Sequence, residues 1–361
     1  MSNFVHTSVC NHTGCITLDR PAALNSLSLA MVRDLTAALL GWSCDPGVDA
    51  VVIQSSSAKA FCAGGDIRFF YEAGCASPRQ GSAQLEDFFT EEYALNHLVY
   101  HYPKPYVALM NGVVMGGGMG VSQAGPDTRL RIVTEATKMA MPEVNIGLFP
   151  DVGGSYFLPR APGQLGTYLA LTGLTIGAAD ALYLDLADLY VPQCQMAALA
   201  TLIGATPGIE LTRVIARFAA PFQAEVGPSS LAAQRATIDS HFGASKVAAI
   251  ELALARDGSA FAQQALSAMQ QRSPLMMCVT LEMLRRGATL DVAACLRMER
   301  SLVRRVFEHG EAQEGIRALV IDKDHAPRWS PASLAEVTDA MLAHFFAPVW
   351  PAHAHPLRHL H

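Results

Sequence analysis

The order in which strand-like and helix-like segments follow one another constrains the fold of this chain more than any other feature. Up to about Val191, short runs rich in β-branched and apolar residues alternate with runs of helical spacing. From about Met196 the pattern is almost entirely helical. A helix between two strands can return the chain to the end of the sheet at which the first strand began, so that the next strand runs parallel to it. This alternation therefore predicts an α/β (α+β) fold with parallel strands. We expect a core over residues 1–200 and a helical region over residues 201–361.

The first segments show the pattern. Phe4–Val9 and Cys15–Leu18 are separated by a His-Thr-Gly turn and predict a hairpin. Leu29–Trp42 has helical spacing, and Ala50–Gln54 predicts a buried strand parallel to the one before it. The polar segment 73–84 predicts a mobile loop. Further expected elements are a helix over 85–100, strands over 106–110, 128–133, 138–140 and 189–191, and helices over 165–171 and 177–182.

The first glycine-rich stretch, Lys59–Ile67, carries the letters KAFCAGGDI. Small residues let a ligand approach the backbone closely, so that successive N–H groups can point at one acceptor. A plain turn from strand to helix is an equally open interpretation of this stretch alone. In that case Asp66 caps the helix that begins near Ile67.

The second glycine-rich stretch, Asn111–Gly120, reads NGVVMGGGMG between a strand and a helical pattern. Backbone N–H groups at the start of a helix lack intrahelical partners and suit an oxyanion. A dinucleotide-binding fingerprint is the competing idea, but the spacing is not GxGxxG and no acidic residue follows at the required distance. The segment 120–124 only approximates the GxSxG turn of serine hydrolases.

A third stretch, Met141–Arg160, contains the carboxylates Glu143 and Asp151 around an apolar segment. Acidic side chains in an apolar setting lose water and hold protons more tightly, which suits general acid/base chemistry near neutral pH. The alternative is a surface turn with two solvated acids. Asp151 would then only cap the turn at Gly153.

Composition limits the kinds of partner. The 361 residues carry a net charge of −6 without any Lys/Arg run, which argues against nucleic acid. No apolar run reaches the ~18 residues of a membrane span, and eight scattered cysteines fit reduced thiols in the cytoplasm. We interpret the histidines after residue 352 as a frayed polar tail rather than a metal site, and Arg297–Ser301 as a charged surface.

Three motifs in order, FCAGGD at 61–66, NGVVMGGGMG at 111–120 and MPEVNIGLFPDVGG at 141–154, resemble those of the crotonase (enoyl-CoA hydratase/isomerase) superfamily. The third motif and RALVIDKDHAPRWSP at 317–331 resemble its thioester-hydrolase branch. The resemblance implies a spiral of ββα turns followed by helices. It also implies a possible homo-oligomer, since the C-terminal helices of many members form a trimer contact.

The resemblance also implies an active site. The family's oxyanion hole uses one backbone N–H from each glycine-rich stretch, which maps to Ala63 and Gly117. The hydrolase branch implies Glu143 as the catalytic carboxylate, with Asp151 to orient or protonate a reacting group. Glu92 would bind the substrate's 3-hydroxyl group, unless it simply pairs with a nearby base. The remaining expected substrate contacts are Gly64, Gly65, Asp66 and Gly116.

The reaction implied is hydrolysis of a short β-hydroxyacyl-CoA thioester, with 3-hydroxyisobutyryl-CoA of valine breakdown as the best candidate. Hydratases of the superfamily use two glutamates, and this chain has Gly120 where the first would lie. An enoyl-CoA hydratase/isomerase and a non-catalytic acyl-CoA-binding protein are the alternatives. Glu143 could activate water or attack directly to give an anhydride. No metal or redox cofactor is expected, because the CoA is part of the substrate.

Overall fold

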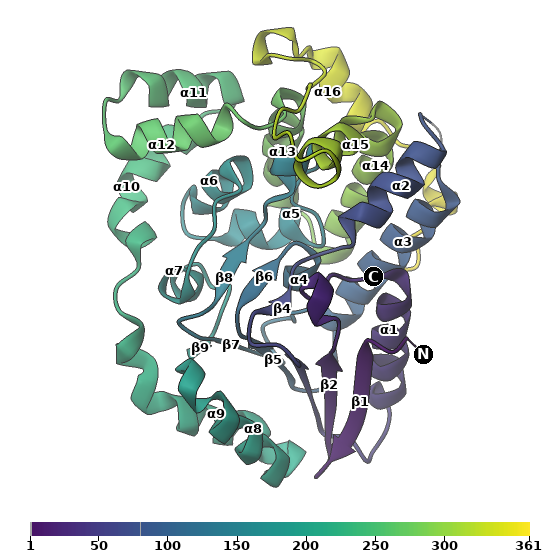
Figure 1. The fold of residues 1–361 in the computed structure, drawn as a ribbon, viewed down its shortest axis with the longest axis vertical. Coiled ribbons are helices and arrows are strands. Elements are labelled where there is room, and N and C mark those ends of the chain that lie inside the picture. The colour runs from purple at the N-terminus through teal and green to yellow at the C-terminus, as the bar shows by residue number, and fades with distance from the viewer. Residues whose placement is uncertain (1, 80) are drawn as a thin grey trace. The chain divides into compact units, whose positions relative to one another are not determined.

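A computed structural model describes residues 2–79 and 81–361 (Figure 1). The strands are β1 (Val5–Cys10), β2 (Thr13–Leu18), β3 (Ala50–Ser55), β4 (Ala60–Cys62), β5 (Tyr106–Met110), β6 (Val113–Met115), β7 (Arg129–Val133), β8 (Lys138–Ala140) and β9 (Leu189–Tyr190). The helices are α1 (Leu29–Ser43), α2 (Ile67–Ala76), α3 (Ala83–Tyr100), α4 (Gly117–Gly120), α5 (Gly154–Phe157), α6 (Leu165–Thr172), α7 (Ala178–Tyr183), α8 (Met196–Ala205), α9 (Leu211–Ala219), α10 (Ser230–Phe242), α11 (Val247–Arg256), α12 (Ala260–Met269), α13 (Pro274–Gly287), α14 (Val292–His309), α15 (Glu311–Ile316) and α16 (Asp339–Phe346). The predicted mixed α/β class with a helical C-terminal region is confirmed.

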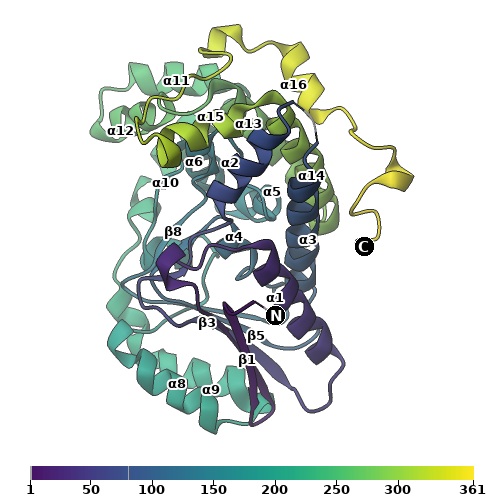
Figure 2. The same cartoon turned by 45° about the vertical axis from the view of Figure 1, so that its right-hand side comes forward.

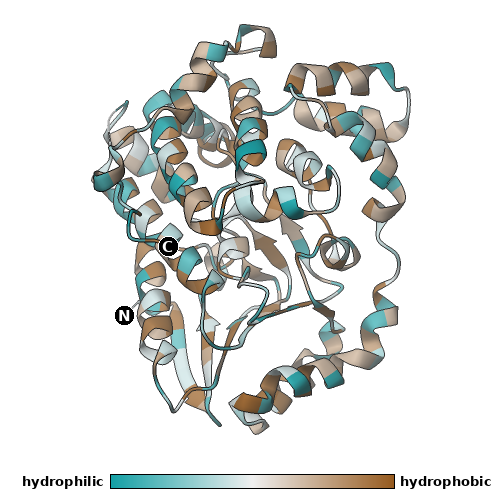
Figure 3. Ribbon diagram, turned by 180° about the vertical axis from the view of Figure 1, so that it is seen from behind, coloured by the Kyte–Doolittle hydropathy of each residue, from teal (hydrophilic) through white to brown (hydrophobic). Residues whose placement is uncertain are grey.

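The larger sheet has the strand order β1-β2-β3-β5-β7-β9. Strands β1 and β2 form the predicted antiparallel hairpin, and every later pairing in this sheet is parallel. Strand β5 is buried along its whole length, as expected for a parallel strand covered on both faces. Its residues Val107 and Leu109 pack with Val52, Ile132 and the buried faces of α8 and α9. Brown, hydrophobic residues accordingly predominate on these central strands (Figure 3).

The smaller sheet, with the order β4-β6-β8, brings the two glycine-rich stretches together. Strand β4 lies inside the first stretch, and β6 lies inside the second. The two strands pair in parallel, with Ala60 opposite Val113 and Cys62 opposite Val114. Helix α4, which follows β6, packs so closely on β4 that a Cβ atom on Gly118 would overlap the Cys62 carbonyl oxygen. Glycine is therefore required at position 118 for steric reasons.

The chain divides into two compact units. The first contains the residues up to Gly65, Leu95–Met139 and Ile176–Ala233, and the second contains Asp66–Ala94, Ala140–Thr175 and Gln234–His361. Both units are built from interleaved segments, whereas the sequence predicted one contiguous boundary near residue 200. That boundary stays a prediction.

Three local expectations are wrong. Helices α2 and α3 extend into the segment 73–84, which was expected to be a mobile loop, and Gln80 within it lies outside the described residues. The expected charged surface at Arg297–Ser301 has Glu299 and Arg300 fully buried on α14. The C-terminal tail is packed rather than frayed, since His355 is buried and lies within 3.3 Å of the Ser301 hydroxyl.

Candidate functional site

In the first unit, the two glycine-rich stretches lie side by side. Gly64 has a φ of +105°, a conformation that residues with a side chain rarely adopt. A Cβ atom built on it would lie 3.2 Å from the Met115 carbonyl oxygen and 3.6 Å from the Gly117 nitrogen. Gly116, which precedes α4, also has a positive φ, of +49°. Glycine at these positions thus permits the close approach of two backbone segments.

The free backbone donors of this region differ from those predicted. The Ala63 N–H donates to the Leu24 carbonyl oxygen at 3.0 Å, so the amide predicted as an oxyanion donor already has an acceptor. The amides of Gly64, Gly65 and Gly117 have no acceptor among the residues that the structure describes. Gly117 with Gly64 or Gly65 is therefore a pair of amides without acceptors, whereas the Ala63 amide would have to share or give up its bond to Leu24. The oxyanion pair of Ala63 and Gly117 stays a prediction.

Asp66 occupies the N-cap of α2, where its carboxylate accepts a hydrogen bond from the Phe69 N–H at 3.3 Å. This is the capping role that the sequence left open. A contact between Asp66 and substrate stays a prediction.

In the second unit, Glu143 opens a short 3-10 turn, Glu143–Ile146, that ends at Gly147 with φ +68°. The side chain is only 7% exposed, so the alternative of a solvated surface acid is wrong. Helix α15 packs directly on this turn, because a Cβ atom on Gly315 would overlap the Ile146 carbonyl group. The predicted catalytic carboxylate therefore sits on a tightly supported turn.

Asp151 is 5% exposed and accepts a hydrogen bond from the Tyr93 hydroxyl at 2.7 Å. The turn that follows is closed by the Asp151 backbone carbonyl, which accepts from the Gly154 N–H at 2.7 Å. The capping function considered from sequence thus falls to the backbone. The Asp151 carboxylate points into the protein interior, where it accepts the hydrogen bond from Tyr93.

Glu92 lies one residue before Tyr93 on α3 and is 2% exposed. Its Oε1 atom has no hydrogen-bond partner, and no ion pair links it to a base among the described residues. The alternative that Glu92 simply pairs with a nearby base is therefore not supported. A buried carboxyl oxygen without a partner is costly and indicates a group kept for binding or chemistry.

The electrostatics of these three carboxyls reflect their shared burial. Loss of water raises the pKa of Glu92 and of Glu143 well above their ordinary range, and the neighbouring Asp151 charge adds to both shifts. Burial also raises the pKa of Asp151 to about 6, although the hydrogen bond from Tyr93 opposes the shift. A carboxyl such as Asp151, with a pKa of about 6, can exchange protons near neutral pH and suits general acid/base work.

Sequence reasoning missed two members of this group, Tyr93 and Glu299. Glu299 is completely buried, and its carboxylate accepts hydrogen bonds from the N–H groups of Gly153 and Ser155. The sequence does hold a signal, because Glu299 falls on the helical stripe that otherwise consists of Cys295, Leu302 and similar apolar residues. An acid on an apolar stripe predicts a buried, hydrogen-bonded carboxyl.

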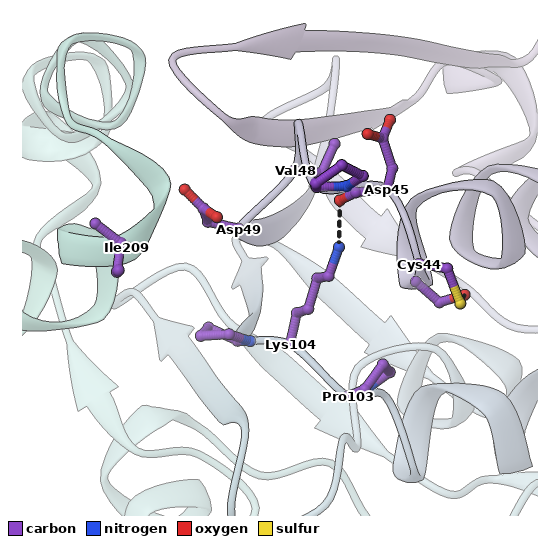
Figure 4. Close-up of a pocket in the computed structure, with 10 residues that line it drawn as sticks. Cys44, Asp45, Val48, Asp49, Pro103, Lys104 and Ile209 are labelled. Carbon is purple, nitrogen blue, oxygen red and sulfur yellow. Dashed lines mark hydrogen bonds between the residues drawn. The ribbon is translucent and has the colours of Figure 1, made fainter.

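One pocket elsewhere in the described chain contains none of the predicted site residues. A pocket of about 440 Å³ in the first unit is lined by Lys104 and by residues of the loop after α1 (Figure 4). The Lys104 ammonium donates to the Asp45 carbonyl oxygen at 2.7 Å, and none of the predicted site residues lines this pocket. Within residues 2–79 and 81–361, no three His, Cys, Asp or Glu side chains are grouped to hold a metal ion.

The fold and the sequence define the class of protein. A family model for enoyl-CoA hydratase/isomerase matches residues 13–346, and the chain belongs to this family. Among solved structures, a carnitinyl-CoA dehydratase from Mycobacterium thermoresistibile is 39% identical with a TM-score of 0.88, covering 97% of this chain and 98% of that one. An enoyl-CoA hydratase from Rhodobacter sphaeroides is 36% identical with a TM-score of 0.84, covering 96% and 98%.

The similar curated proteins include a narrower group. The mitochondrial 3-hydroxyisobutyryl-CoA hydrolase of Xenopus tropicalis is 41% identical over 337 residues, which are 92% of this chain and 86% of that protein. The human enzyme of the same name is 40% identical over 338 residues, with the same two coverages.

Proposed function

We propose that this protein hydrolyses a short β-hydroxyacyl-CoA thioester, namely 3-hydroxyisobutyryl-CoA to 3-hydroxyisobutyrate and CoA. The observation that carries the proposal is the buried pair Glu143 and Asp151 in a chain that has Gly120 where hydratases carry their other glutamate. The relatives named 3-hydroxyisobutyryl-CoA hydrolase support the same reaction.

The reaction adds water across the C–S bond. The water oxygen bonds to the carbonyl carbon, the electron pair of the C–S bond leaves on sulfur, and one water proton ends on the thiolate. We assign removal of that proton to Glu143, because its raised pKa makes the ionised carboxylate a stronger base than an exposed glutamate. Asp151, with a pKa of about 6, orients the water or protonates the leaving sulfur.

Two backbone amides would stabilise the oxyanion formed on the carbonyl oxygen. We assign one to Gly117 and the other to Gly64 or Gly65, because these N–H groups lack acceptors within the described chain. Removing one such donor typically costs about 10²–10³ in rate. Gly116 would let the substrate come close to the backbone at this point.

Glu143 has a second possible route, direct attack on the carbonyl carbon to give a mixed anhydride that water then opens. A single turnover in ¹⁸O-labelled water, followed by mass analysis of the protein, separates the routes. Label retained in the Glu143 carboxyl identifies an anhydride that water opens at the glutamyl carbon. An unlabelled protein is expected of the general-base route and also of an anhydride opened at the substrate's acyl carbon.

We assign recognition of the substrate's 3-hydroxyl group to Glu92. Its Oε1 atom is buried without a partner, so a hydroxyl group would satisfy it and an analogue without the hydroxyl would not. The assignment predicts preference for β-hydroxyacyl-CoA over the matching unsubstituted acyl-CoA.

Free-thiol release from a small acyl-CoA panel tests the function. We expect rapid release from 3-hydroxyisobutyryl-CoA and slow release from isobutyryl-CoA, which differs only by the hydroxyl group. Crotonyl-CoA, followed by its enoyl absorbance, tests the second candidate, an enoyl-CoA hydratase/isomerase, which the two closely similar solved structures favour. Loss of enoyl absorbance without thiol release would establish that candidate, and neither signal would indicate an acyl-CoA-binding protein.

The cofactor requirement and the partners of the protein are also proposals. We propose that no metal or redox cofactor takes part and that neither nucleic acid nor a membrane is a partner. No helix of the described residues is long and apolar enough to cross a bilayer. The relatives are named mitochondrial, so the cytoplasmic localisation predicted from sequence is not supported by them, and a homo-oligomer stays a prediction.

A further inference from the structure

The turn that follows Asp151 has an unfavourable backbone. Val152 has a φ of +51°, and Gly153 has a φ of +91°. A left-handed conformation is ordinary for glycine, but it is a true outlier for a β-branched residue such as valine. Strain of this kind persists only where the surroundings impose it. Something outside the turn must therefore hold residues 151–155 in place.

Glu299 of α14 is the group that holds this turn. Its Oε2 atom accepts from the Gly153 N–H at 2.8 Å, and its Oε1 atom accepts from the Ser155 N–H at 2.9 Å and the Ser155 hydroxyl at 2.5 Å. Both carboxylate oxygens are thus occupied by the residues directly after the strained Val152. No cation among the described residues pairs with Glu299, so its ligands are these donors alone.

Helix α13 fixes the other side of the same turn. Gly287 approaches it so closely that a Cβ atom there would overlap the Ser155 carbonyl oxygen. The 151–155 turn is therefore confined between Gly287 of α13 and the buried Glu299 carboxylate of α14. Movement of either would release the strain at Val152 and displace Asp151, whose carboxylate accepts from Tyr93.

We propose that Glu299 is a positioning residue that holds the 151–155 turn and thereby aims the Asp151 carboxylate. The proposal deepens the proposed function, because it matters for turnover only if Asp151 acts on the thioester. A charged or neutral carboxyl keeps acceptor oxygens toward the two amides. A glutamine must turn its NH₂ group toward one of those N–H groups, which removes one hydrogen bond and sets two donors against each other.

The test compares Glu299→Gln with Glu308→Gln, a matched control on the same helix. Glu308 pairs with Arg304 and Arg305 and does not touch the turn. For release of thiol from 3-hydroxyisobutyryl-CoA we expect kcat of Glu299→Gln to fall about 10- to 100-fold, since small misplacement of a reacting group has effects of this size. We expect KM to change less than about twofold, because the reacting group and not the binding of CoA is disturbed. The control should keep both values.

Hydrogen exchange at the Gly153 and Ser155 amides gives a readout independent of activity. We expect slow exchange in the wild type and in Glu308→Gln, and faster exchange in Glu299→Gln. If the wild type releases no thiol, the proposed function fails while exchange still decides whether Glu299 holds the turn. Wild-type kcat with unchanged exchange in Glu299→Gln, or a rise in KM alone, would overturn the proposal.

A milder variant covers the case in which Glu299→Gln does not fold. Ser155→Ala removes only the hydroxyl donor and leaves the Ser155 N–H bond in place. We then expect a smaller fall in kcat, about three- to tenfold, with faster exchange at residue 155. Unchanged kcat and exchange in a folded Ser155→Ala protein would contradict the proposal.

Discussion

At the scale of the residue, Asp151 is governed by two opposing influences. Burial raises its pKa to about 6, while the Tyr93 hydroxyl stabilises the ionised form through a 2.7 Å hydrogen bond. The balance leaves a carboxyl that titrates close to physiological pH. Its behaviour is thus set by a neighbour on α3 that lies 58 residues away in the sequence.

We predict that Tyr93→Phe moves the pH profile. Without the hydroxyl donor the ionised form of Asp151 loses stabilisation, so its pKa rises further. The limb of the kcat/KM profile that reports Asp151 should shift to higher pH by about one unit, the size expected for a hydrogen bond to a charged group. Tyr102→Phe, which removes a buried hydroxyl bonded to the Leu39 carbonyl oxygen, is the control. A profile that does not move in Tyr93→Phe would refute this role.

We predict that Glu92→Gln slows thiol release and makes the folded protein more stable than the wild type as the pH rises. Burial raises the folded-state pKa of Glu92 above its unfolded value, so stability from the held proton is full at low pH and is lost as pH rises toward the folded pKa. The side-chain amide of the variant does not ionise, so the variant does not lose stability in this way as the pH rises. Between pH 5 and pH 8 the stability of the variant relative to the wild type should therefore rise.

Thermal unfolding of both proteins at pH 5 and pH 8 measures this gain in stability. Thiol release by Glu92→Gln should be slower than by the wild type. The exposed helix residue Glu72, changed to Gln, is the control that should gain nothing. An equal melting temperature difference at pH 5 and pH 8 for Glu92→Gln would show that Glu92 is not held in its protonated form.

At the scale of the element, helix α15 connects the late segment of the chain to the turn that carries Glu143. It lies alongside α2 (Figure 2) and packs on the turn that begins with Glu143. Gly315 abuts Ile146, and Gly147 abuts the Glu311 carbonyl oxygen, so neither glycine can carry a side chain. A short helix far along the sequence thus sets the position of the turn on which the predicted catalytic carboxylate lies.

We predict that Gly315→Ala lowers both stability and kcat. The added methyl group would force apart α15 and the 143–146 turn, and overpacking of this kind typically costs about 1–3 kcal/mol. Gly258→Ala, in the same unit with open space around it, is the control and should be nearly neutral. Thermal melting and thiol-release kinetics check both variants. A Gly315→Ala protein with wild-type kcat would show that the turn does not depend on this contact.

At the scale of the whole molecule, periodicity predicted the fold class and many of the elements, and the motifs predicted the family. The alternation of strands and helices gave the α/β class and most element positions, and the three motifs led to the family that the comparisons confirm. It could not predict the Leu24–Ala63 hydrogen bond, because nothing local marks which amide of FCAGGD is already satisfied. The link between Glu299 and Gly153 was also hidden, since it joins segments 146 residues apart.

We predict that Glu143 drives hydrolysis of a β-hydroxyacyl-CoA thioester. The most direct measurement is the steady-state rate of thiol release from 3-hydroxyisobutyryl-CoA by the wild type and by Glu143→Gln, with both proteins shown to be equally folded. We predict clear turnover by the wild type and a loss of about 10²–10⁴ in kcat for the variant, the usual contribution of a positioned acid or base. No thiol release by the wild type, or undiminished release by Glu143→Gln, would contradict the account.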